Sequence, residues 1–102
     1  MMLTGTPVLR ARRSESGLMS HAEFDETTTP YCAGLGYFVK LNDCDFIGKA
    51  ALEKADKRKR TFGMRERGSI AKRGRLITVN GNTVGQVCSS SWSPYQECGV
   101  AL

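Results

Sequence analysis

The segment RLITVNGNTVGQVC, residues 75–88, constrains the fold more than any other part of the sequence. Asn-Gly between two alternating runs is the strongest short-range signal for a β-hairpin, because the favoured two-residue turn needs positive φ at both central residues. The segment therefore predicts strands over residues 75–79 and 83–88, joined by Asn80-Gly81. Gly85 inside the second strand predicts a bulge or a close backbone contact.

Shorter strand candidates lie on either side of this hairpin, at residues 61–64 and in CGVAL at residues 98–102. SSSWSP, residues 89–94, has the small polar residues of a loop. The sequence stops inside an apolar run, so we expect an incomplete barrel whose last strand leaves an open edge. An unpaired edge favours pairing with another chain, which would make a homo-oligomer.

The first half of the chain predicts helices and one further strand. Residues 8–19 have the pattern of a helix end, with Gly17 as its left-handed cap. LGYFVKL, residues 35–41, is aromatic and β-branched and predicts a strand, and residues 48–57 predict a second helix. The fold class that follows is α+β: a short helical segment followed by a mostly antiparallel β-barrel.

Length and charge limit the class of protein. A chain of 102 residues is long enough for one small fold. It shows no apolar run long enough to span a membrane and no secretory signal, which favours a cytoplasmic protein. The net charge of +5 suits anionic partners. Few aromatic residues accompany the basic ones, however, so base stacking and nucleic-acid binding are disfavoured.

The residues that usually carry chemistry are sparse. The cysteines have no C-x-x-C spacing and His21 is the only histidine, which argues against a metal site and for free thiols at Cys32, Cys44, Cys88 and Cys98. With one histidine and no G-x-S-x-G elbow, SSSWSP does not predict a serine nucleophile. The glycines of residues 33–52 fit neither a dinucleotide fingerprint nor a P-loop, so they predict a turn and a helix start.

Glu15 is the side chain with a physical case for ligand binding. A carboxylate accepts two N–H bonds side by side, which suits an aminopyrimidine or guanidinium-like ligand. From composition alone, a surface glutamate paired with a neighbouring arginine is the simpler interpretation. Trp92 is open to two similar interpretations, as a ligand platform or as a half-buried anchor of its loop.

Four motifs in register resemble the glycine-cleavage T-protein (aminomethyltransferase) family. R-S-E-S-G at residues 13–17 is similar to R-x-E-x-G, and D-F-I-G-K-A-A-L at 45–52 to D-F-I-G-R-x-A-L. T-T-P with A-G-L-G-Y-F-V-K, residues 28–40, is similar to T-P-x-x-A-G-L-G-W-x-V. V-G-Q-V-C-S-S-S-W-S-P with G-V-A-L, residues 84–102, is similar to G-x-V-T-S-G-x-x-S-P with G-x-A-L. The resemblance covers nearly the whole chain from about Leu9.

This resemblance implies an enzyme that transfers an aminomethyl group from lipoyl-bound H-protein to tetrahydrofolate and releases ammonia. It implies a three-domain ring around a central folate site, ending in a β-barrel. Residues 1–47 would then be the tail of the folate-binding region, and residues 48–102 a truncated C-terminal barrel domain. Glu15 would be the cofactor-binding residue that hydrogen-bonds the pterin ring of tetrahydrofolate.

The chain also departs from the family pattern. The family's catalytic aspartate precedes R-x-E-x-G, so no residue here is assigned a catalytic role and we expect the fragment alone to be inactive. Asp43 stands near the position of an arginine that contacts folate in many members, and Ser90 replaces a family glycine. Two alternatives stay open: the C-terminal region of a sarcosine or dimethylglycine dehydrogenase-like protein, and a non-catalytic module that self-associates or binds anions.

Overall fold

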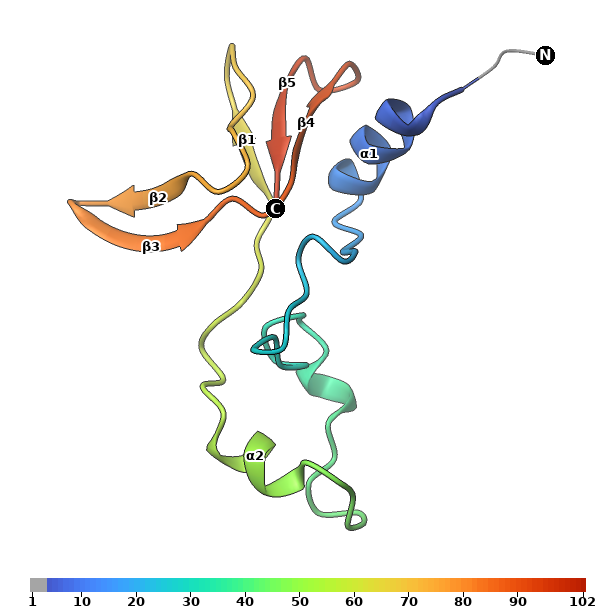
Figure 1. Ribbon diagram of the computed structural model, residues 1–102, viewed down its shortest axis with the longest axis vertical. Coiled ribbons are helices and arrows are strands. Elements are labelled where there is room, and N and C mark those ends of the chain that lie inside the picture. The colour runs from blue at the N-terminus through green and yellow to red at the C-terminus, as the bar shows by residue number, and fades with distance from the viewer. Residues whose placement is uncertain (1–3) are drawn as a thin grey trace. The chain divides into compact units, whose positions relative to one another are not determined.

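The computed structural model describes residues 4–102, which form two compact units. The first, here the sheet unit, joins the segment up to Glu23 with Phe62–Leu102. The second, the loop unit, is Phe24–Thr61. Figure 1 labels the helices and strands of both units. The predicted boundary between residues 47 and 48 remains a prediction.

A three-stranded antiparallel sheet in the order β1-β5-β4 forms the centre of the sheet unit (Figure 1). Its strands are Met64–Glu66, Cys98–Ala101 and Ser90–Ser93, respectively. All four residues of β5 are buried: β1 and β4 pair with its two edges, and α1 and the loop that contains Ser69 contact the strand. The predicted C-terminal strand is confirmed, but it is central in the sheet, so the expectation that it leaves an open edge is wrong.

Strand β4 lies where SSSWSP predicts a loop, and that prediction is wrong. Serine is a poor strand former, but the backbone of β4 pairs with β5 over four residues, and such pairing overrides a weak local preference. Neighbouring side chains along a strand point to opposite faces. Ser93 is accordingly fully buried, whereas Trp92 is 40% exposed.

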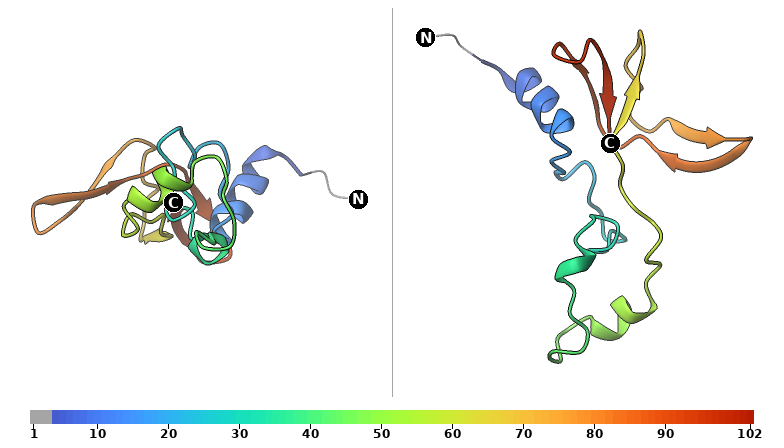
Figure 2. Two further views of the ribbon diagram at one scale, coloured as in Figure 1. Left: turned by 90° about the horizontal axis from the view of Figure 1, so that it is seen from below. Right: turned by 180° about the vertical axis from the view of Figure 1, so that it is seen from behind.

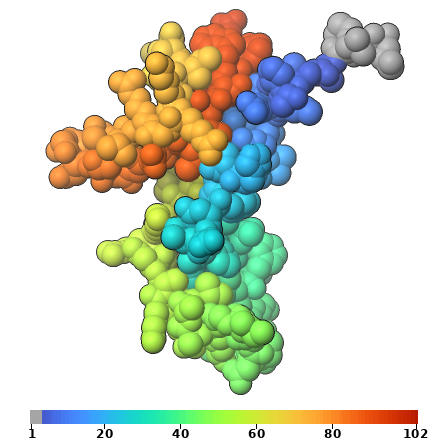
Figure 3. Space-filling model, viewed as in Figure 1, coloured from blue at the N-terminus to red at the C-terminus, as the bar shows by residue number. Residues whose placement is uncertain are grey.

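The predicted hairpin is confirmed as β2 (Leu76–Val79) and β3 (Asn82–Gln86). Asn80 and Gly81 have φ values of 52° and 80°, the left-handed pair that the two-residue turn requires. Ile77 pairs with Gly85 but Thr78 pairs with Thr83, so the register shifts by one residue beside Gly85, as a bulge does. In the space-filling view the hairpin, in orange, projects from the rest of the sheet unit (Figure 3).

Helix α1 (Thr6–Glu15) confirms the helix predicted near residues 8–19, although it begins and ends earlier. It ends in a turn in which Gly17 has a φ of 68° and the Leu18 N–H donates to the Arg13 carbonyl at 3.0 Å. The helix lies along β4 and contacts β5 (Figure 2). Ala11 and Ser14 are its buried residues.

A small apolar cluster joins these elements of the sheet unit. Ala71, Val87 and Ala101 are buried together, and the half-buried side chains of Met64 and Ile77 pack against them. Gly99 of β5 permits a close approach of the loop between β1 and β2, because a Cβ at Gly99 would overlap the backbone carbonyl of Ser69. The loop before β2 therefore lies directly on the central strand.

The loop unit contains the 3-10 turn η1 (Gly36–Phe38) and the short helix α2 (Lys49–Lys54). The helix confirms the prediction for residues 48–57, but the strand predicted at residues 35–41 is wrong. Gly34, with a φ of 75°, and the bond from the Leu35 N–H to the Pro30 carbonyl at 2.8 Å turn that segment back on itself. No neighbouring strand is available to pair with it within the loop unit, and an isolated strand is not stable in water.

The fold is therefore α+β, with few helices and two antiparallel sheets. No closed barrel is present among residues 4–102, so the barrel part of the prediction is not confirmed. Within the same residues, no helix has the length and apolar character needed to cross a membrane.

Candidate functional site

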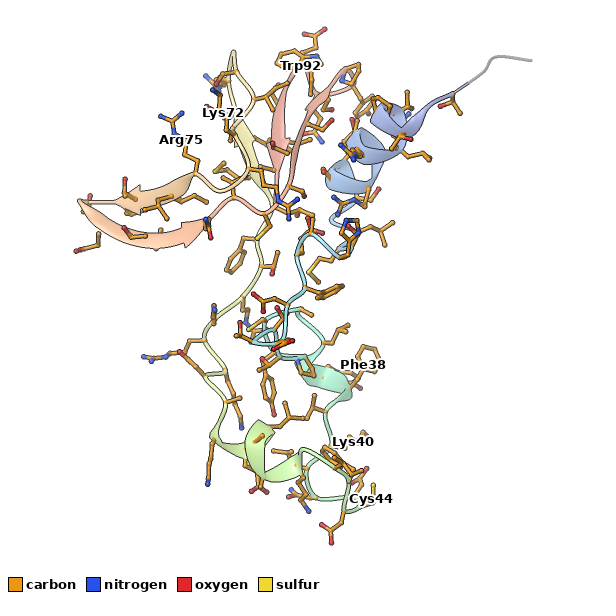
Figure 4. All side chains as sticks on the ribbon, in the orientation of Figure 1. Phe38, Lys40, Cys44, Lys72, Arg75 and Trp92 are labelled. Carbon is orange, nitrogen blue, oxygen red and sulfur yellow. The ribbon has the colours of Figure 1, made fainter. Side chains whose placement is uncertain are left out.

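An apolar groove of about 670 Å³ lies in the sheet unit between α1, the loop before β2 and the β4–β5 hairpin. Its walls include three large side chains that are partly or largely exposed, namely Ile70, Trp92 and Tyr95. Figure 4 labels Trp92 at the far end of the β4–β5 hairpin. A groove of this volume with apolar walls and few polar groups is the usual form of a small-molecule site.

Glu15, the residue singled out from sequence, lines this groove at the end of α1. Its side chain is only 10% exposed, although it does pair with a neighbouring arginine, as the simpler interpretation expected. Oε1 accepts a hydrogen bond from Ser93 Oγ at 2.5 Å, and Oε2 accepts one from Arg12 Nη1 at 3.0 Å. These two bonds, the one from Ser93 first, hold the pKa of the Glu15 carboxyl below its usual value. The groove therefore contains a fixed carboxylate at neutral pH.

Ser93 is the residue that sequence reasoning missed. It is fully buried, donates to Glu15 and accepts a hydrogen bond from the Gln96 N–H at 3.0 Å. The Ser93–Glu15 bond joins two of the quoted motifs across 78 positions of the sequence. The only sequence signal for Ser93 was its place before Pro94 in the S-P pair that ends the fourth motif, since the residues around it predicted a loop.

Arg13, two positions before Glu15, has a structural role rather than a place in the groove. Its Nη1 donates to Glu23 Oε2 at 2.7 Å and to the Leu18 carbonyl at 2.9 Å. The Glu23 side chain is fully buried. Burial opposes its charge, but the approach of Ser89 and the bonds from Ser20 and Arg13 outweigh burial and lower the pKa of the Glu23 carboxyl. This ion pair fixes the turn that follows α1 and hence the end of the helix where Glu15 lies.

The two other motifs fold as turns and a helix start inside the loop unit. Thr29 Oγ1 accepts the Cys32 N–H at 3.3 Å and donates to Cys32 Sγ at 3.3 Å. Those hydrogen bonds, led by the one from the Thr29 side chain, lower the pKa of the Cys32 thiol against the effect of burial. Gly48, with a φ of 92°, precedes α2. The interpretation of these glycines as a turn and a helix start is confirmed.

Exposed aromatic residues also occur in the loop unit. Tyr37 and Phe38 pack edge to face at 5.6 Å between ring centroids, and both are largely exposed (Figure 4). Lys57 Nζ lies 5.4 Å from the centroid of the buried Tyr31 ring, a cation–π contact.

Comparison with known proteins gives a consistent result. No family model matches the chain. The chain is 40% identical over 96 residues to the aminomethyltransferase of Prochlorococcus marinus, covering 88% of this chain and 26% of that protein. It is 44% identical over 85 residues to that of Synechococcus sp. strain CC9311, covering 78% of this chain and 23% of that protein. The aminomethyltransferase of Thermotoga maritima is 36% identical over 88 residues, and this alignment covers 83% of this chain and 24% of that protein.

The chain thus spans about a quarter of the length of the curated relatives it matches. Their shared name agrees with the four motifs, two of which meet at the Glu15–Ser93 hydrogen bond. The chain belongs to the aminomethyltransferase family, the family of the glycine-cleavage T-protein.

Proposed function

We propose that the groove of the sheet unit binds the pterin ring of tetrahydrofolate, with Glu15 as the residue that recognises it. The protein that contains this chain would transfer an aminomethyl group from lipoyl-bound H-protein to tetrahydrofolate. Tetrahydrofolate supplies the nitrogen atoms that accept the one-carbon unit. This chain's own contribution is to bind and orient the pterin.

The position and charge of Glu15 carry this proposal. An ionised carboxylate offers about four lone-pair sites, and Ser93 and Arg12 together use two of them. The remaining sites can accept the amino group and the adjacent ring N–H of a pterin as a pair of charge-assisted hydrogen bonds. Arg12 is 70% exposed, so it can move aside without loss of packing, whereas buried Ser93 keeps the carboxylate in place.

The walls of the groove suit the rest of such a ligand. A pterin is flat and aromatic, and it gains most from contact with apolar and aromatic side chains. Trp92 and Tyr95 line the same groove as Glu15 and are 40% and 82% exposed, so both have surface available to a ligand. A carboxylate beside aromatic surface is the combination that a pterin requires.

The alternatives are less well supported. The curated relatives named above are all aminomethyltransferases, which favours that family over a sarcosine or dimethylglycine dehydrogenase-like protein. Self-association through the C-terminal strand loses its basis, because β5 is paired on both sides.

Tetrahydrofolate binding to the 102-residue chain tests the proposal. Trp92 is the only tryptophan and lines the groove, so its fluorescence reports occupancy of this site, and calorimetry gives the affinity. We expect Glu15→Gln, which keeps the size of the side chain and removes its charge, to weaken binding about 10- to 100-fold. Glu26→Gln is the matched control, because Glu26 is exposed and belongs to the loop unit. Equal affinities of Glu15→Gln and the parent chain, or no binding by the parent chain, would contradict the proposal.

A further inference from the structure

We propose that the sheet unit has a second binding site, a basic groove on the other side of α1, which binds a small molecule through a carboxylate or phosphate group. This groove has a volume of about 370 Å³. It does not depend on the function proposed for the groove that contains Glu15.

The two grooves lie on two sides of one helix and adjoin at Arg10. Side chains three and four positions apart share a helix face. Val8, Ala11 and Glu15 line the apolar groove, whereas Thr6, Arg13 and Ser14 line the basic one. The second groove is completed by the turn after α1 and by residues near the start of β4. Arg10 and Ser90 line both grooves, so the two cavities adjoin at these residues.

The charge of the lining is entirely positive. Three arginines line the groove, Arg10, Arg13 and Arg73, and no aspartate or glutamate does. The buried carboxylate of Glu23 neutralises Arg13. Arg10 comes from α1 and Arg73 from the loop before β2. Neither forms an ion pair among residues 4–102. Two unpaired guanidinium groups around one cavity repel each other unless an anion lies between them.

The other lining groups complete an oxyanion site. Guanidinium groups bind carboxylate and phosphate oxygens in pairs of parallel hydrogen bonds. The hydroxyls of Thr6 and Ser90 are further donors on the same lining, whereas the Ser20 hydroxyl already donates to Glu23 Oε2 at 3.3 Å. Ser89 Oγ also lines the groove and is buried with no hydrogen-bond partner among residues 4–102, although it approaches Glu23.

The volume sets the class of ligand. A cavity of about 370 Å³ exceeds what one free phosphate ion needs and falls in the lower range of small-molecule sites. The ligand is therefore an organic acid or a phosphate ester with its anionic end at Arg10 and Arg73. The surrounding hydroxyls suit a polar body rather than an apolar one.

The test is a titration of the 102-residue chain with inorganic phosphate and, separately, with glutarate, followed by two-dimensional amide NMR. We expect both anions to shift the amide signals of Ser20, Ser89 and Ser90, and the tighter one identifies the class of anionic group. Arg73→Gln should weaken binding about tenfold, the value of one charge-assisted pair of bonds. Arg73 is the better probe because Arg10 also lines the apolar groove.

Arg75→Gln is the matched control, because Arg75 lies two positions after Arg73, carries the same charge and is exposed outside the groove (Figure 4). Its effect should stay below about twofold, which is the non-specific effect of one surface charge. The proposal is overturned if neither anion shifts those three amides. It is also overturned if Arg73→Gln and Arg75→Gln weaken binding equally, since the anions would then respond only to the net charge.

Discussion

The ion pair between Arg13 and Glu23 offers the sharpest test of how the end of α1 is held. The perturbation is Glu23→Gln, which keeps the shape of the side chain and one acceptor oxygen but removes the charge. The Glu23 side chain is 0% exposed and that of Arg13 is 21% exposed, so the substitution leaves a mostly buried guanidinium without its counter-charge. We expect a clear loss of stability.

The structure sets the size of this loss. Removing one partner of a fully buried pair costs about 3–5 kcal/mol. Arg13 is partly exposed, and its Nη1 keeps the bond to the Leu18 carbonyl, so part of that cost is recovered. We therefore expect Glu23→Gln to lower the free energy of unfolding by about 2–3 kcal/mol, a large share of the roughly 5–15 kcal/mol typical of a domain.

The pH dependence of stability gives an independent readout. The pKa of the Glu23 carboxyl is lowered in the folded chain from its ordinary 4.5. A carboxyl with a lowered pKa contributes stability that is fully present above pH 4.5 and is lost as the pH falls through its folded value. The stability difference between the parent chain and Glu23→Gln should accordingly shrink as the pH falls below about 4.5.

Urea unfolding followed by the fluorescence of Trp92 measures both effects, with Arg13→Gln and the double variant completing a mutant cycle. A loss within about 0.5 kcal/mol, as for an ordinary surface substitution, would refute the reasoning. So would a coupling energy near zero in the cycle, because the loss would then not arise from the pair.

Two further substitutions test the sheet unit. Gly99→Ala should destabilise the chain by about 3 kcal/mol, the upper end for overpacking, because its Cβ would overlap the Ser69 carbonyl. Urea unfolding measures this loss. A loss below about 1 kcal/mol would show that the loop containing Ser69 moves away from β5. Ser93→Ala should weaken tetrahydrofolate binding by freeing Glu15, and lower stability by about 1–2 kcal/mol through the lost bond to the Gln96 N–H. Thr83→Ala is its control, since Thr83 is exposed on β3, lies outside the groove and makes no side-chain hydrogen bond within residues 4–102; equal effects of the two variants would rule out the positioning role of Ser93.

The parts of the fold that sequence predicted correctly are those set by neighbouring residues. Asn80-Gly81 requires a tight turn whatever surrounds it, and Gly17 and Gly48 take the left-handed conformations that end or precede a helix. The strand predicted at residues 35–41 failed for the opposite reason. Its residues have strand propensity, but a strand also needs a partner to pair with, and the loop unit provides none.

Sequence by itself determined the hairpin, the presence of a helix in the first part of the chain, and the family to which the motifs point. Only the tertiary structure decided that β5 is the central strand, that SSSWSP is a strand, and that Ser93 holds the Glu15 carboxylate across 78 positions. Turn and cap preferences depend on the backbone of a few adjacent residues, so they can be read locally. Strand pairing and side-chain hydrogen bonds between distant segments depend on which surfaces the folded chain brings together, and no local pattern contains that information.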